Sequence, residues 1–115
     1  MTDLSVAGMV IAGNVVETIV SIAVKSVEGV ASVGSPAAGG LLARFGAKQQ
    51  APAIESDVDE NDKLHVAVRI EVFFGCVLPD VAAQVRRAVA EAIEEQIGIE
   101  VGSVDVYVDG IRFTD

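Results

Sequence analysis

The stretch KLHVAVRIEVFF, residues 63–74, decides the fold of this 115-residue chain. Its apolar side chains alternate with other residues, which is the period of a β-strand with one buried face. The predicted buried face carries Leu64, Val66, Val68, Ile70, Val72 and Phe74. The predicted open face carries His65, Ala67, Arg69, Glu71 and Phe73. This pattern predicts a half-buried antiparallel strand.

Two segments with helical periodicity flank this strand. In the first, Asn14 is expected to cap the helix, with Glu17 completing a capping box, and Gly29 is expected to end it. The second is expected to place Pro79 at its first position and to stop at Gly98. The expected stripe of the first helix is Val15, Val16, Ile19, Ile22, Ala23 and Val27. The expected stripe of the second is Val81, Val85, Ala88, Val89, Ala92 and Ile93.

Shorter apolar runs complete the predicted elements. Residues 9–11, 30–33 and 53–58 are expected to be short strands, and a last strand turns Val104, Val106 and Val108 inward. Residues 1–8 are expected to be a loose terminus. The order strand–helix–strand–strand–strand–helix–strand predicts an α+β two-layer sandwich, with two helices on one face of a mixed or antiparallel sheet. The length suits a single domain over residues 1–115.

Residues 34–52 differ from the rest in composition. They contain four glycines and two prolines and show little periodicity, so a flexible loop is expected. Within it, Leu41, Leu42 and Phe45 form a small apolar group beside Arg44 and Lys48. Two interpretations stay open: these apolar residues fold back onto the core, or they dock a partner.

The charge of the chain argues against two kinds of partner. It carries 17 acidic and 8 basic residues, a formal net charge of −9 at pH 7. Because nucleic-acid binding relies on Lys and Arg to neutralise phosphates, no nucleic-acid partner is expected. The same charge disfavours direct docking on an anionic membrane surface. Membrane association is therefore expected to pass through a protein partner.

Cysteine usage and hydropathy indicate a cytoplasmic protein. Cys76 is the only cysteine, so no disulfide can form within the chain. The first residues lack the basic start of a signal peptide. The longest mostly apolar stretch, residues 4–16, is shorter than the roughly 20 residues of a membrane-spanning helix. No direct membrane insertion is expected.

Two loop motifs approach known ligand sites and fall short of them. Residues 34–39 have the glycine spacing of a phosphate-binding loop, but Gly40 and Leu41 stand where Lys and Ser or Thr are needed. Residues 57–68 approach a calcium loop, but Asp62 and Val68 replace the required Gly and Glu. We expect a plain loop and a solvated turn, with no metal and no cofactor.

His65 and Cys76 are the remaining candidates for chemistry. His65 is the only histidine, and nothing in the sequence orients Ser56 or Ser103 toward it. Cys76 precedes the second helix, a position at which thiols can be activated. Without a second cysteine or an obvious base, Cys76 is expected to be a small packing residue. We therefore expect no catalytic residues and no enzymatic activity.

Three segments, by their order and spacing, resemble the bacterial alkaline shock protein family of envelope stress proteins. They are IAGNVVETI at residues 11–19 with VEGV at 27–30, VFFGCVLPDV at 72–81, and GIEVGSVDVYVDGI at 98–111. The resemblance covers about residues 9–113. The chain departs from the family at Gly13 and Asn14, where Pro and Glu are common, and at Cys76 and Val77.

The resemblance implies a cytoplasmic, non-enzymatic protein linked to envelope homeostasis under stress, held near the membrane by a membrane-anchored partner or by self-assembly. We therefore expect a protein–protein interaction scaffold or adaptor. Exposed strand edges, which can accept a strand from a partner, are one expected docking surface. The expected partner-binding residues are Leu41, Leu42, Arg44, Phe45, Arg69, Glu71, Phe73 and Tyr107.

Two other hypotheses stay open. An RNA-binding or other small regulatory binding module would use the same kind of two-layer domain, but it predicts a clustered basic face. An enzyme would need a deep pocket lined by converging polar groups.

Overall fold

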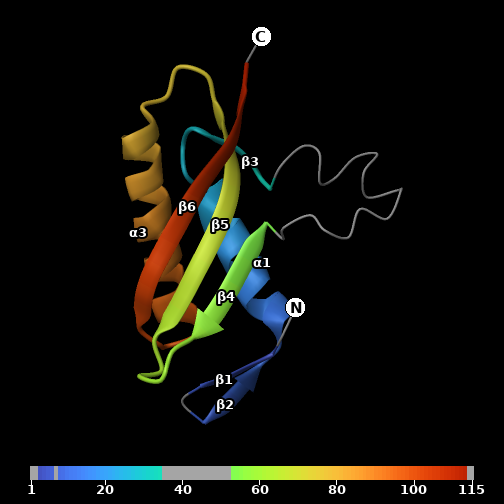
Figure 1. Cartoon of the computed structure of the whole chain (residues 1–115), viewed down its shortest axis with the longest axis vertical. Helices are drawn as coiled ribbons and strands as arrows, with labels where there is room; N and C mark the ends of the chain where they lie inside the picture. The colour runs from blue at the N-terminus through green and yellow to red at the C-terminus, as the bar shows by residue number, and fades with distance from the viewer. Residues whose placement is uncertain (1–2, 7, 35–52, 114–115) are drawn as a thin grey trace, which may run out of the picture.

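The computed structural model describes residues 3–6, 8–34 and 53–113, which form two layers (Figure 1). Strands β3 (Val30–Val33), β4 (Ile54–Val58), β5 (Leu64–Phe73) and β6 (Val101–Arg112) form one sheet. Helices α1 (Gly13–Lys25) and α3 (Leu78–Gln96) cover one face of it. A hairpin of β1 (Leu4–Val6) and β2 (Met9–Ile11) precedes α1. The predicted α+β sandwich is confirmed.

β5 is the central strand of the sheet. On one edge it pairs antiparallel with β4 over residues 64–68 and with β3 over residues 70–72. On the other edge β6 runs parallel to β5 along its length. The helix α3 returns the chain to the start of β5, which is the connection that parallel neighbours need. The sheet is therefore mixed, and the strand predicted as antiparallel also has a parallel neighbour.

The alternation in β5 predicts its buried face. The side chains that point toward the helices are at most 1% exposed: Leu64, Val66, Val68, Ile70 and Val72. The predicted stripe of α3 is also buried at its centre, through Val81, Val85, Val89 and Ile93. These residues and those of α1 form one hydrophobic core between the layers. The opposite face of the sheet is left without a covering layer in the described part of the chain.

The face of α1 differs from the prediction. Val15 and Ile22 are exposed, whereas Val20 and Val24 are fully buried together with Val16. The helix is rich in apolar residues on all sides, so several stripes fit the sequence equally well. Packing against β3, β4 and α3 buries the stripe of Val16, Val20 and Val24, which are four residues apart.

The helix ends also differ in detail. Asn14 lies inside α1, and Ala12 occupies the cap position without a side-chain hydrogen bond, so the predicted capping box is wrong. α1 ends at Lys25, before Gly29. Pro79 takes the second position of α3 and not the first. The predicted stop at Gly98 agrees with the structure, where this residue follows the C-cap with a positive φ of 84°.

Two predictions about chain ends are corrected. Residues 4–6, expected to be loose, form β1, and its Leu4 and Val6 are buried in the core. A strand of three residues is too short for its alternation to be recognised. Phe74, expected to face inward, is 65% exposed, because β5 ends at Phe73 and Gly75 turns the chain with a φ of 103°.

β3 and β4 together form one interrupted edge strand. The NH of Gly34 donates to the carbonyl of Arg69 at 2.7 Å, and the NH of Arg69 donates to the carbonyl of Ala53 at 2.8 Å. Gly34 and Ala53 thus meet at the same residue of β5. The predicted loop, with Leu41, Leu42, Arg44 and Phe45, joins these two points and lies outside the described residues.

This geometry allows the fold and the loop to be tested separately. Replacing residues 35–52 with four Gly or Ser residues should leave the fold intact, because the described residues on either side of this segment already form a buried core. Shortening a connection of this size changes the free energy of unfolding by about 1 kcal/mol through closure entropy. Urea unfolding followed by circular dichroism measures this, and a variant that does not fold would contradict it.

Candidate protein-interaction surface

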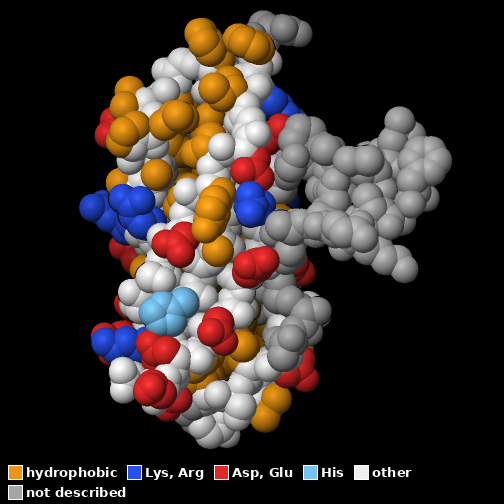
Figure 2. Space-filling view, in the orientation of Figure 1, with side chains coloured by type: hydrophobic (Ala, Val, Ile, Leu, Met, Phe, Trp, Pro, Cys, Tyr) orange, Lys and Arg blue, Asp and Glu red, His pale blue; other side chains and the backbone are white. Residues whose placement is uncertain are grey.

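The uncovered face of the sheet is built from cross-strand rows of side chains. His65 of β5 lies between Asp57 of β4 and Ser103 of β6 in the register. One row further on, Ala67 lies between Glu55 and Asp105, and beyond it Arg69 lies beside Tyr107. Figure 2 views this face and shows acidic side chains scattered over its lower half. The small Ala67 side chain leaves a shallow groove there, lined by Glu55, Asp57, His65 and Asp105.

The middle of the face holds a fixed arginine. The guanidinium carbon of Arg69 lies 4.7 Å from the centroid of the Tyr107 ring, a cation–π contact. Its Nη1 also lies 3.3 Å from both carboxylate oxygens of Asp109. Arg69 and Tyr107 were two expected partner-binding residues, and the structure brings them together. Tyr107 keeps 46% of its surface exposed.

Glu71 lies on the same face but is buried, with 2% of its surface exposed. Its Oε1 accepts a hydrogen bond of 2.6 Å from the Ser32 hydroxyl and lies 3.0 Å from Nη2 of Arg112. Gly110 leaves room for it, since a Cβ at that position would lie 3.0 Å from Oε2. Glu71 therefore holds β3 and the end of β6 onto β5, and its carboxylate is not an exposed contact. Phe73, the next expected contact on this face, is half-buried.

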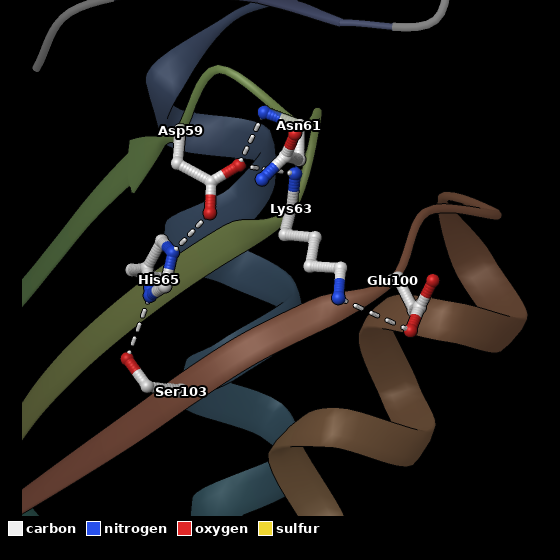
Figure 3. Close-up of polar contacts among 6 residues, drawn as sticks. All are labelled: Asp59, Asn61, Lys63, His65, Glu100 and Ser103. Atoms are coloured by element: carbon white, nitrogen blue, oxygen red, sulfur yellow. Dashed lines mark hydrogen bonds and ion pairs between the residues drawn. The ribbon is translucent and has the colours of Figure 1, made fainter.

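The lower end of the face carries a network that the sequence did not reveal (Figure 3). His65 Nε2 lies 2.7 Å from Oδ2 of Asp59, and its Nδ1 lies 2.8 Å from the Ser103 hydroxyl. Asp59 Oδ1 also accepts the backbone NH groups of Asn61 and Lys63 at 2.8 and 3.1 Å. The imidazole lies directly over Gly102, where a Cβ would be 2.6 Å from the ring.

This network connects the β4–β5 turn to β6. In the neutral form of His65, the proton lies on Nε2, which donates to Asp59 because an ionised carboxylate can only accept. Nδ1 then accepts a hydrogen bond from the Ser103 hydroxyl. The hydrogen bond from His65 lowers the pKa of the Asp59 carboxyl below its ordinary value of 3.8, and the NH groups of Lys63 and Asn61 lower it further. The ionised carboxylate thus stabilises the turn.

The lowered pKa gives a pH-dependent effect with a defined sign. A carboxyl whose pKa is depressed by folding stabilises the native state above its ordinary pKa and loses that contribution as the pH falls through the folded value. Asp59→Asn should therefore be less stable than the wild type at pH 7. The difference should shrink as the pH falls through and below 3.8. Urea unfolding at several pH values tests this, and a gap that is constant with pH would contradict it.

Exposed apolar side chains gather at the opposite end of the molecule. They belong to the turn after β5, the start of α3 and the end of β6, and we call them the end cluster: Phe74, Val77, Leu78, Ile111 and Phe113. Figure 2 shows apolar side chains gathered at this end of the face. The rings of Phe74 and Phe113 lie with their centroids 5.0 Å apart, and Phe113 is 73% exposed. Exposed apolar patches on folded domains mark sites of interaction.

The end cluster was not predicted as a surface from the sequence. Phe74 was placed in the core and residues 77, 78, 111 and 113 were not considered as contacts. The available signal is the apolar run VFFGCVL at 72–78, which continues past Gly75, where a strand must end. Cys76, within this run, is half-buried against the core, and its Sγ lies 3.8 Å from the Gly29 carbonyl.

The structure also bears on metal and membrane sites. Within residues 3–6, 8–34 and 53–113, His, Cys, Asp and Glu side chains do not group in a way that could hold a metal ion. Neither described helix has the length and apolar character needed to cross a bilayer.

A family model described as having a cell envelope-related function matches residues 2–113 of the chain. The chain belongs to the alkaline shock protein 23 family. This confirms the family that the three segments of sequence indicated. The match spans both layers of the fold, the uncovered face and the end cluster.

The chain is similar to two proteins of Bacillus subtilis (strain 168). The protein YqhY, whose name calls it uncharacterized, is 28% identical over 111 residues, which cover 96% of this chain and 82% of YqhY. YloU, named in the same way, is 34% identical over 56 residues, or 49% of this chain and 47% of YloU. The fold also resembles solved structures of MamM-CTD variants. One has a TM-score of 0.50 and 16% identity and covers 85% of this chain and 96% of its own. At this identity the likeness shows the fold alone.

Proposed function

We propose that this chain is a non-enzymatic protein–protein interaction scaffold or adaptor in the bacterial cell-envelope stress response. It would act in the cytoplasm and reach the membrane through a membrane-anchored protein partner, with self-assembly as a further contact. The cell envelope-related function of its family supports the cellular setting. The net charge of −9 supports a protein partner over a bare anionic membrane.

The end cluster is the observation that carries this proposal. Its aromatic pair and three aliphatic side chains are between 40% and 73% exposed, whereas the apolar residues of the core are buried. Aromatic side chains are enriched among the residues that dominate binding energy at interfaces. A partner that covers this cluster removes apolar surface from water, at a gain of about 25 cal/mol for each Å² buried.

The expected partner-binding residues extend this surface. Arg69, Phe73 and Tyr107 lie along the open face below the end cluster and are proposed to contact the same partner. Glu71 would contribute indirectly, by holding Arg112. The loop residues Leu41, Leu42, Arg44 and Phe45 stay a separate proposal, which the loop replacement described above can test.

The His65 network is proposed to be structural. Ser103, His65 and Asp59 are connected in the order found in serine hydrolases. However, acyl transfer also needs donors aimed at a developing oxyanion. The groove beside His65 is lined by the carboxylates of Glu55, Asp57 and Asp105, which would repel a negative charge. The network is better suited to fastening the turn than to catalysis.

The proposal is tested by tagging the protein in its native cell, separating membranes from cytosol and identifying what co-purifies. The expected result is recovery with the membrane fraction, together with an integral membrane protein, at protein levels that match the endogenous ones. Recovery only in the cytosol, with no stable partner, would contradict the adaptor function.

A further inference from the structure

β6 has one edge that no strand pairs with in the described part of the chain. The NH groups of Arg69 and Phe73 point away from β6, toward Ala53 and Gly29. The even-numbered residues of β5, such as Val68 and Ile70, therefore form the hydrogen bonds to β6. In the parallel register, Val68 pairs with Val106 and Ile70 with Val108. These pairings direct the NH and carbonyl groups of Asp105 and Tyr107 toward β5. The groups of Val104, Val106 and Val108 consequently point away from the sheet.

This free edge is not protected by a short length, by proline or by bulges along its middle part. Natural edge strands tend to be short, carry Pro, or are bulged along their exposed part. β6 has 12 residues and contains no proline. Its two register shifts lie near its ends, beside Gly102 and Asp109, and leave residues 104–108 regular. Three consecutive outward residues are therefore available to pair with an added strand.

The two faces of this edge specify the chemistry of the added strand. On the helix side lie Val104, Val106 and Val108, and on the open side lie Asp105 and Tyr107. Asp109 is already occupied by Arg69, whereas Asp105 has no ion pair among the described residues. A strand with aliphatic side chains on one face and Lys or Arg on the other would match both faces of β6.

We propose that the free edge of β6 binds an extended segment of another protein, in which basic residues alternate with aliphatic ones. This rests on the proposed adaptor function and names the kind of segment that the partner supplies. The cytoplasmic flanks of membrane-spanning helices are rich in Lys and Arg, so a membrane-anchored partner presents such segments. The end cluster continues the site at the end of the same strand.

A second copy of β6 fits this edge less well than a single strand does. Figure 1 shows α3 extending past the upper half of β6 on its free side. An added strand would lie over α3, whereas a twofold-related copy would bring its own α3 to the same place. Two chains of charge −9 would also repel each other.

The site is tested with a nine-residue peptide that alternates Lys and Val, blocked at both ends and labelled for fluorescence anisotropy. A scrambled peptide with the same residues controls for non-specific attraction to an acidic protein. Asp105→Lys should weaken binding of the alternating peptide by about tenfold or more, as loss of a charge-assisted contact does. Glu17→Lys makes the same charge change at an exposed position of α1, in the helix layer and away from the free edge, and should leave binding within about twofold.

Hydrogen exchange gives a readout that does not depend on any variant. In the free protein, the amides of Val104, Val106 and Val108 should exchange rapidly, while those of Asp105 and Tyr107 are protected by β5. The alternating peptide should slow exchange at the three valines by about tenfold or more. Val106→Pro removes an outward NH and no hydrogen bond to β5, and it also loses part of a side chain that packs against the core. It should abolish peptide binding while circular dichroism shows an intact fold.

The following outcomes would contradict the proposed strand-binding site. Equal binding of the scrambled peptide, or no added protection at the three valines, would show that the edge does not accept a strand. Concentration-dependent protection of these valines without peptide would assign the edge to a second copy. If a membrane partner co-purifies equally with wild type, Asp105→Lys and Val106→Pro, the result would support the adaptor function and contradict the strand-binding site.

Discussion

Ile70→Ala should destabilise the protein by about 2–5 kcal/mol, the usual cost of emptying a fully buried aliphatic site. Ile70 is 0% exposed and lies on the helix-facing side of the central strand, within the hydrophobic core. Its neighbour Arg69 points to the uncovered face, where its contacts with Tyr107 and Asp109 are partly solvated. Arg69→Ala should therefore cost less than about 1 kcal/mol.

This pair of variants is a matched test of the two-layer architecture. The substitutions are adjacent in the chain and affect opposite faces of β5. Urea unfolding of both proteins, with the m-value checked for constancy, gives the two free energies. Similar losses for Ile70→Ala and Arg69→Ala would mean that a second layer covers the face described here as open.

The second large effect is expected at the buried carboxylate. Arg112→Ala leaves Glu71 with the Ser32 hydroxyl as its remaining partner among the described side chains. An incompletely satisfied buried charge costs about 1–3 kcal/mol. The loss should be reduced when Glu71→Gln is present, because the neutral amide needs no cation. The coupling between the two sites should fall within about 0.5–3 kcal/mol.

A double-mutant cycle of wild type, Arg112→Ala, Glu71→Gln and the double variant measures this coupling directly. Arg112 is 51% exposed, so its loss creates no cavity that would mask the electrostatic effect. Additive losses in the cycle would show that the two side chains do not act together. In that case the end of β6 would be held by its backbone pairing alone.

The parts of the fold that the sequence predicts are those with a long, regular signal. The ten residues of β5 alternate without interruption, and the stripe of α3 recurs regularly from Val81 to Ile93. Both patterns indicate which face of the element is buried, and the buried faces determine how the helices and the sheet pack as two layers. The family resemblance was carried by other segments, at the first helix, at the junction around Gly75 and in the strand that follows Gly98.

The parts that could not be predicted depend on contacts between distant residues. Ser103 approaches His65 because of the parallel register of β5 and β6, and no local sequence pattern predicts this register. Glu71 alternates outward in the sequence but is buried by Ser32 and Arg112, which lie 39 and 41 positions away. The exposed position of Phe74 depends on where β5 ends, and strand ends are poorly marked by alternation.

We propose that a membrane-anchored partner binds to the end cluster. The most direct test compares the amount of that partner recovered with Phe74→Ser/Phe113→Ser and with Val10→Ser/Ile22→Ser, in which two equally exposed apolar residues elsewhere are changed. We expect the first pair of substitutions to abolish co-purification of the partner and to release the protein from the membrane fraction, while the second pair leaves both at the wild-type level. Equal recovery with both variants would contradict it.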